Sequence, residues 1–135
     1  MGNLLGQAAL IRHLERSVSA VPTVPRTASQ SNRPMVERAV TVEWLVAFAH
    51  RHDAWRMKTW EVVENIIKPM TRRLRCRFCE LDSEVSDDVL GRADSFLSHC
   101  WGNEFGDLVS AARHNARAGR RYWVDIFAVS NTALA

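Results

Sequence analysis

The chain has 135 residues, of which 47% are hydrophobic and 24% are charged, a composition typical of a single globular domain. Its net charge of +3 is modest, and its arginines are interleaved with acids, which argues against a nucleic-acid-binding surface. No apolar run approaches the ~20 residues needed to span a bilayer, and an odd number of cysteines without a secretory signal favours the cytoplasm.

Residues 1–34 predict a flexible tail that carries one short helix. The tail holds three prolines among many Ser, Thr and Ala residues, which favours an unstructured segment. It also has four arginines and a single acid, Glu15, a composition that suits an organelle transit peptide as well. The short helix is predicted from apolar residues at three- and four-residue steps, namely Leu4, Leu5, Ala8, Ile11 and Leu14.

Residues 35–92 predict a helical lead-in followed by a charged loop. The segment 42–52 has a helical stripe behind a cap at Thr41, and a second helix begins with a cap at Thr59. Pro69 should limit or kink this second helix, because proline lacks the amide that a helix needs. The basic run 72–77 and the acidic run 80–88 then indicate a charged surface loop.

Cys76 and Cys79 have the C-x-x-C spacing of a zinc knuckle or a redox pair. A structural zinc ion needs four converging ligands, and the remaining candidates are His99 and Cys100. Because adjacent residues on an extended segment point in opposite directions, both are poorly placed to reach one metal. We therefore interpret Cys76 and Cys79 as small buried thiols and expect no metal or cofactor.

Residues 93–135 predict a strand, a helix and a second strand. The strands are expected at Ser95–His99 and Tyr122–Ala128, because both are short apolar runs rich in aromatic and β-branched residues. Between them, apolar residues at helical spacing predict a helix over Glu104–Ala118, capped by Asn103 and ended by Gly119. This order predicts one right-handed βαβ unit with parallel strands, hence an α/β fold preceded by two or three helices.

The polar and aromatic residues at the strand ends are the candidate ligand-binding site. Ser98, His99, Trp101 and Gly102 follow the first strand, and Asp125 interrupts the second. Ligands of parallel sheets bind beyond the carboxyl ends of strands, so we expect His99 and Asp125 within reach of each other and Asp125 largely buried. Two interpretations stay open: a structural pair, or the polar floor of a pocket with Trp101 as its apolar wall.

The motifs FLSHCWG (96–102) and YWVDIFAVSN (122–131) resemble the core of the heterokaryon-incompatibility domains and their Toll/interleukin-1-receptor-like (TIR-like) relatives. In those domains a strand ending in Ser-Tyr-x-Trp-Gly precedes a helix and a strand of the Trp-Ile-Asp type that leads to a glutamine. His99 stands where an aromatic residue is usual, and Asn131 stands where glutamine is usual. The residues that match the pattern are Ser98, Trp101, Gly102, Trp123 and Asp125.

The resemblance implies a flavodoxin-like parallel sheet and a signalling or interaction module that acts through association with a protein partner or with itself. The alternative is an enzyme that cleaves a nicotinamide nucleotide, as some TIR-like relatives do with a downstream glutamate. The sequence ends at Ala135 before that region, so we expect a truncated domain without this activity by itself. We also expect self-association through an open strand at Tyr122–Val129, and neither a nucleic-acid nor a membrane partner.

Overall fold

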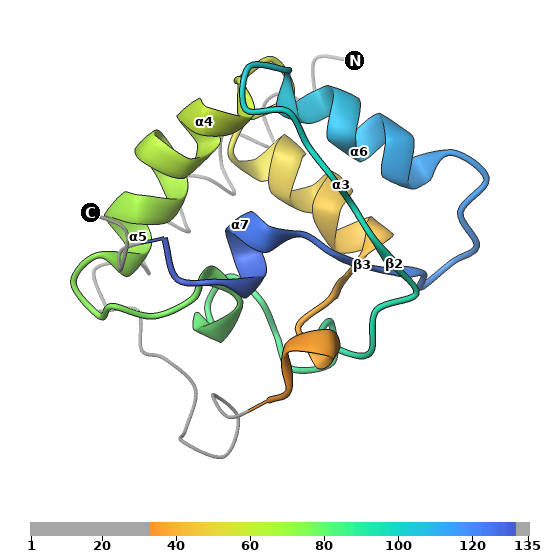
Figure 1. Cartoon of the computed structure of the whole chain (residues 1–135), viewed down its shortest axis with the longest axis horizontal. Helices are drawn as coiled ribbons and strands as arrows, with labels where there is room; N and C mark the ends of the chain where they lie inside the picture. Colours follow the sequence, from red (N-terminus) through yellow and green to blue (C-terminus); the bar gives the residue numbers. More distant parts are fainter. Residues whose placement is uncertain (1–32, 132–135) are drawn as a thin grey trace, which may run out of the picture.

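The computed structural model describes residues 33–131. The predicted tail helix and transit peptide therefore fall almost entirely on residues 1–32, outside the described residues. The described part is a mixed α/β arrangement with a small three-stranded sheet (Figure 1). Its elements, in chain order, are η1 (Met35–Glu37), β1 (Val40–Thr41), α3 (Val42–Arg51), α4 (Thr59–Val62), η2 (Val63–Ile67), α5 (Lys68–Thr71), η3 (Phe78–Glu80), β2 (Ser95–Phe96), α6 (Phe105–Arg113), β3 (Arg121–Trp123) and α7 (Asp125–Ala128).

Helix α3 confirms the prediction made from its cap and its apolar stripe. The Thr41 hydroxyl accepts a hydrogen bond from the backbone amide of Trp44 at 3.1 Å, which satisfies one of the donors left free at a helix start. Glu43 lies in the first turn and Arg51 in the last, as the helix dipole favours. The buried face consists of Val42, Trp44, Leu45, Phe48 and Ala49.

The helix predicted near Thr59 also exists, but its cap and its kink differ from the prediction. Lys58 is the N-cap, and Thr59 is the first helical residue. Before Pro69 the helix widens into the π-helical turn η2, then continues as α5. In a regular α-helix the ring of Pro69 would press against the carbonyl of Asn65 four residues earlier. The wider turn relieves this contact, so proline widens the helix here rather than ending it.

The hydrophobic core is centred on the Phe48 ring of α3. Four other buried aromatic rings surround it, and all of them lie within 5.6 Å of its centroid. They come from α3, η3, α6 and α7, so this one cluster joins elements from both halves of the chain (Figure 1). Tilted and edge-on pairs at such distances add stabilisation beyond the apolar area that they bury. The four rings belong to Trp44, Phe78, Phe105 and Phe127.

The sheet has the predicted parallel pair and one strand that was not predicted. Strand β2 pairs in parallel with β3, with Ser95 opposite Tyr122. Strand β1 pairs with the other side of β3 in an antiparallel manner, with Val40 opposite Tyr122. The strand order is therefore β1-β3-β2, and the expectation of a purely parallel sheet with β3 at an open edge is wrong. Strand β1 has only two residues, too few to produce a sequence pattern.

The prediction of a strand throughout Tyr122–Ala128 is wrong in its second half. The strand ends at Trp123, and Asp125–Ala128 forms the short helix α7. A continuous apolar run does not distinguish a buried strand from a buried helical turn. Three residues of α7, Ile126, Phe127 and Ala128, are buried. The apolar run therefore predicts the burial of these residues correctly but their backbone conformation wrongly.

The boundaries of α6 also differ from those predicted. The helix ends at Arg113, five residues before the predicted Ala118, and Asn115 has a positive φ of 55°. Its N-cap is Glu104, without a side-chain capping bond, so the predicted cap at Asn103 is wrong. Phe105, Leu108, Val109 and Ala112 form the buried stripe as expected. Within residues 33–131 we find no helix long and apolar enough to cross a membrane.

Candidate functional site

The structure brings His99 and Asp125 together, as the sequence predicts. The Nδ1 atom of His99 lies 3.3 Å from the Oδ1 atom of Asp125. This is an ion-pair distance, although Asp125 Oδ1 makes no hydrogen bond of standard geometry within residues 33–131. The two residues come from the segment after β2 and from the start of α7, so the parallel β2–β3 pair is what places them side by side.

The burial of Asp125 differs from the expectation. The His99 side chain is only 7% exposed, whereas that of Asp125 is 41% exposed. The prediction that Asp125 is largely buried is therefore wrong. Asp125 begins a helical turn instead of occupying a strand interior, so its carboxylate can reach solvent while it faces the ring. The buried member of the pair is the imidazole.

The contact with Asp125 brings a carboxylate oxygen to one edge of the His99 ring. Nδ1 and Oδ1 are 3.3 Å apart without a hydrogen bond of standard geometry, so the attraction between the two side chains is electrostatic. The Trp101 ring meets the His99 ring edge-on, with the centroids 4.6 Å apart. Trp101 is itself 48% exposed, so it shields one side of the imidazole from water, in the manner of the predicted apolar wall.

A cavity of about 150 Å³ lies beside His99. The predicted site residues Ser98 and His99 line it, whereas Trp101, Gly102 and Asp125 do not. The lining residues that the sequence analysis missed are Thr59, Cys100, Asn103, Glu104, Asp107, Leu108 and Ala111.

Backbone hydrogen bonds between the start of α4 and the loop before α6 hold the lining of this cavity together. The Thr59 amide donates to the Asn103 carbonyl at 3.0 Å, and the Trp60 amide donates to the Trp101 carbonyl at 3.2 Å. These bonds join the loop before α6 to the start of α4, at the top of the view in Figure 1. Of the missed residues, Glu104 and Asp107 had a local signal as acids at a helix start. Thr59 had no such signal, because it lies far in the sequence from the other residues that line the cavity.

The start of α6 is held by the loop between α3 and α4 instead of by a side-chain cap. The amide of Phe105 donates to the Met57 carbonyl at 2.7 Å, and the amide of Gly106 donates to the Trp55 carbonyl at 2.9 Å. A Cβ atom at Gly106 would lie 2.5 Å from that Trp55 oxygen. Glycine is therefore required here for the close approach of two backbones.

The outer side of β2 is an exposed aromatic edge. Phe96 is 65% exposed, and its ring packs only partly over Trp123, with the centroids 5.5 Å apart. Residues 91–100 alternate strictly between partly buried and exposed, which is the pattern of an extended strand with one face on the protein. Strand β2 itself is Ser95–Phe96, and the Leu97 amide extends its hydrogen bonding to β3 by one residue.

The three cysteines divide into two environments. Cys76 and Cys79 are buried, whereas Cys100 is exposed. Burial, followed by the nearby Glu80 carboxylate, raises the pKa of the Cys76 thiol to about 11. Such a thiol is a poor metal ligand and a poor nucleophile, since both roles need the thiolate. In the described part of the chain, no three His, Cys, Asp or Glu residues are grouped to hold a metal ion.

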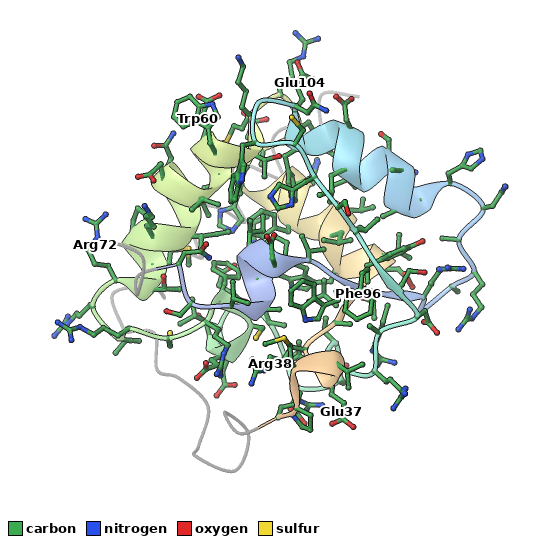
Figure 2. The ribbon with its side chains drawn as sticks, viewed as in Figure 1. Glu37, Arg38, Trp60, Arg72, Phe96 and Glu104 are labelled. Carbon is green, nitrogen blue, oxygen red and sulfur yellow. The ribbon has the colours of Figure 1, made fainter. Side chains whose placement is uncertain are left out.

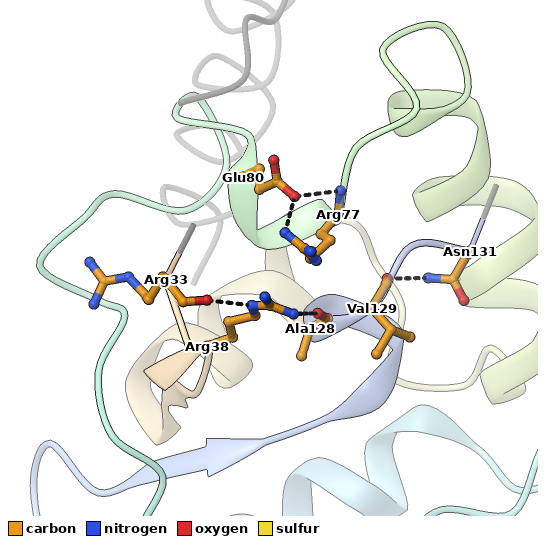
Figure 3. Close-up of polar contacts among 7 residues, drawn as sticks. All are labelled: Arg33, Arg38, Arg77, Glu80, Ala128, Val129 and Asn131. Carbon is orange, nitrogen blue, oxygen red and sulfur yellow. Dashed lines mark hydrogen bonds and ion pairs between the residues drawn. The ribbon is translucent and has the colours of Figure 1, made fainter. Parts of the chain in front are cut away.

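A second polar cluster lies at the end of α7 and has a structural role (Figure 3). The Arg38 guanidinium donates to the carbonyls of Arg33 at 2.9 Å and Ala128 at 3.5 Å, and Asn131 donates to the Ile126 carbonyl at 2.8 Å. Burial, with a smaller contribution from the Arg77 guanidinium, lowers the pKa of Arg38. The Ala128 and Ile126 carbonyls belong to α7, so Arg38 and Asn131 satisfy acceptors that the end of this helix leaves free.

No protein-family model matches the chain, and neither a curated protein nor a solved structure is found to be similar to it.

Proposed function

We propose that this chain is an association module of the TIR-like and heterokaryon-incompatibility-like class, and that it pairs with a second copy of itself through the outer edge of β2. The FLSHCWG and YWVDIFAVSN motifs support the class, since they lie on the two parallel strands β2 and β3 and on the segments that directly follow them. The single parallel pair with α6 between its strands is what supports a relationship to flavodoxin-like sheets. The proposed association is argued from the unpaired outer edge of β2.

The backbone of this edge is oriented for strand pairing. The Leu97 amide donates to the Trp123 carbonyl at 2.9 Å, so the backbone groups of Ser95 and Leu97 face β3. In a strand, alternate residues direct their amides and carbonyls to opposite sides. Those of Phe96 and Ser98 therefore face outward, and no described strand pairs with them. Such an edge is a template for another strand.

The absence of charged side chains along this edge favours a second copy of the chain as the partner. Sheet edges are usually protected against pairing by lysine, proline or a bulge, whereas residues 95–102 contain no Asp, Glu, Lys, Arg or Pro. At the start of the strand, Asp94 is already bound by the Arg117 guanidinium at 3.0 Å and by the Arg121 amide at 2.9 Å. These bonds lower the pKa of Asp94. A two-fold antiparallel pair would thus place no unpaired like charges opposite each other.

The exposed ring of Phe96 would supply the apolar contact of such a pair. In an antiparallel arrangement centred on Phe96, the two Phe96 rings lie directly opposite each other, and cross-strand aromatic pairs are among the stabilising ones. A pair of single strands buries less area than a standard interface. We therefore expect a dissociation constant in the micromolar range or weaker, so the fraction of dimer depends on the local chain concentration.

Sedimentation velocity of the full chain over a range of concentrations tests this proposal. The wild type should show a monomer–dimer equilibrium, and Phe96→Glu should weaken it at least about tenfold because two carboxylates would face each other. Ser98→Pro should weaken it as well, because it removes one outward amide and leaves Phe96 in place. Circular dichroism checks that each variant is folded.

The matched control is Leu74→Glu, which adds the same charge at another exposed apolar residue. Leu74 is 36% exposed and follows Arg72 by two residues; Arg72 and Phe96 lie on opposite sides of the view in Figure 2. This variant should associate like the wild type. A wild type that stays monomeric at high concentration would overturn the proposal, as would a Phe96→Glu variant that associates normally.

A further inference from the structure

We infer that the turn after α5 is a docking surface for an anionic lipid bilayer. This basic turn consists of residues 72–75, with the sequence Arg-Arg-Leu-Arg. The inference goes beyond the association at β2 and does not depend on it, because the two surfaces share no residue, and Arg72 and Phe96 lie on opposite sides of the view in Figure 2. A contact with a membrane surface needs no bilayer-spanning run, so the inference replaces the expectation that the chain has no membrane partner.

Positive charge is concentrated in and around the basic turn. Residues 68–79 contain neither Asp nor Glu but five cations, namely Lys68, Arg72, Arg73, Arg75 and Arg77. Two of them are neutralised inside the protein: Lys68 pairs with Glu64 at 2.6 Å, and Arg77 pairs with Glu80 at 2.8 Å. The three arginines of the basic turn are exposed and make no side-chain hydrogen bond or ion pair within residues 33–131. Their charges are therefore available to an external anion.

The backbone of Arg75 shows that the basic turn keeps an arginine against the local preference. Its φ is 49°, in the left-handed region where glycine is favoured because a Cβ atom is strained there. The end of α5 accounts for cations at Arg72 and Arg73, which the helix dipole favours, but it does not account for an arginine at a position suited to glycine. A strained residue whose side chain contacts no described partner points to a role outside the fold.

Leu74 favours a lipid surface over other anionic partners. Its side chain is 36% exposed and stands between the arginines. At an anionic bilayer, guanidinium groups bind the headgroup phosphates while a neighbouring apolar side chain enters the boundary with the acyl chains. The basic turn has no aromatic side chain on which bases could stack, which disfavours a nucleic acid. All four of its residues are exposed, which disfavours an enclosed pocket for a free phosphate.

The acidic run of a second copy is a poor match for the basic turn. Three carboxylates of the run 80–88 are already ion-paired within the chain, because Glu80 pairs with Arg77, Glu84 with Arg51 and Asp87 with Arg33. Binding to the basic turn would require these internal pairs to break. The charges of the described residues therefore favour a partner that supplies its own anions.

Co-sedimentation of the full chain with lipid vesicles tests this inference. The chain should bind vesicles of equal parts phosphatidylcholine and phosphatidylserine, should not bind vesicles of phosphatidylcholine alone, and should dissociate as the ionic strength rises. Equal binding to both kinds of vesicle would overturn the inference, as would tighter binding to a DNA duplex or to polyglutamate than to the anionic vesicles. The Phe96→Glu chain should bind like the wild type at concentrations where both are monomeric, so a failure of the association proposal would not affect the result.

Charge-removing variants locate the surface. Replacing all three arginines of the basic turn with glutamine should weaken vesicle binding about a hundredfold, since each cation near an anionic surface contributes about fivefold. The matched control replaces three other exposed arginines that have no ion pair in the described part of the chain, namely Arg56, Arg92 and Arg113. It has the same net charge and should lose less than about fivefold. Equal losses in the two triple variants would mean that net charge alone acts, which would overturn the inference.

Single substitutions separate binding from a structural role. Arg75→Gly should leave the Tm unchanged or raise it, because glycine adopts a positive φ without strain, while vesicle binding falls about fivefold. Leu74→Ala should weaken binding roughly fivefold, because it removes most of the exposed apolar side chain. A lower Tm with unchanged vesicle binding in Arg75→Gly would overturn the inference. So would a loss of self-association in sedimentation velocity when the three arginines are replaced, because the basic turn would then contact another copy of the chain.

Discussion

Adding one methyl group at Gly106 tests how the wall of the His99 cavity is held in place. In an ordinary exposed helix, replacing glycine with alanine stabilises the helix by up to ~1 kcal/mol, because alanine loses less backbone entropy on folding. At Gly106 the added Cβ would lie 2.5 Å from the Trp55 carbonyl oxygen and 3.3 Å from the Trp55 carbonyl carbon. We therefore expect Gly106→Ala to be destabilising, against the usual sign.

The magnitude follows from the bonds that the clash would break. The Trp55 oxygen belongs to the backbone, so it can retreat only if its loop moves. That movement lengthens the Gly106–Trp55 bond of 2.9 Å and the neighbouring Phe105–Met57 bond of 2.7 Å. Each contributes about 0.5–1.5 kcal/mol, and Phe105 is fully buried, so water does not replace its partner. After the gain in helix propensity is subtracted, the net loss is roughly 1–2 kcal/mol.

Thermal and urea denaturation followed by circular dichroism measure this loss. A destabilisation of that size lowers the Tm of a domain this small by roughly 5–15 °C. Gly102→Ala is the matched control, because no atom lies within 4 Å of a Cβ added there; its stability should change by less than about 0.5 kcal/mol. If Gly106→Ala is as stable as the wild type or more stable, the loop does not hold the start of α6 and the reasoning fails.

Three further predictions concern single polar groups. Tyr122→Phe should cost about 1 kcal/mol by the same denaturation assay, since the buried Tyr122 hydroxyl donates to the Ala112 carbonyl at 2.6 Å; unchanged stability would contradict that bond. Iodoacetamide at pH 8 should alkylate Cys100 much faster than Cys76, because a pKa raised from 9.0 to about 11 lowers the thiolate fraction about a hundredfold. Peptide mapping by mass spectrometry measures both rates, and equal rates would be inconsistent with a buried Cys76. Since the folded chain keeps the Cys76 proton more tightly, stability should also fall as the pH rises from 9.0 to about 11.

The sequence predicted those elements whose signals are local and redundant. Helix α3 had both a cap at Thr41 and an apolar stripe, and the structure has both. The parallel pairing of β2 with β3 followed from the length of the connection and the helix within it. The proximity of His99 to Asp125 followed in turn, because parallel strands bring their carboxyl ends to one edge of a sheet. In each case two independent features of the sequence agreed.

The predictions from the sequence are wrong where one local pattern is compatible with two backbone conformations. They also fail where the hydrogen-bond partner of a residue lies far away in the sequence. Residues 124–128 are apolar enough for a strand or for a helical turn, and only the packing of Phe127 against Phe48, with the centroids 5.0 Å apart, favours the turn. The same ambiguity produced the wrong burial of Asp125, since a residue that begins a turn can face solvent whereas one inside a central strand cannot. Thr59 could not be assigned to the cavity, because it reaches Asn103 through a backbone bond between segments 44 residues apart.

The exposure of Asp125 changes what this pair can do. A buried aspartate would have to be permanently satisfied by protein donors, which would make the pair structural and leave the imidazole to adapt to it. With the carboxylate 41% exposed and the imidazole 7% exposed, the carboxylate stays partly solvated while the ring is enclosed. A half-exposed carboxylate can lie beside a buried ring without the large desolvation cost of a buried charge. The pair therefore lies just beyond β2 and β3 with its acidic member partly open to solvent, at the end of the sheet where ligands of parallel strands bind.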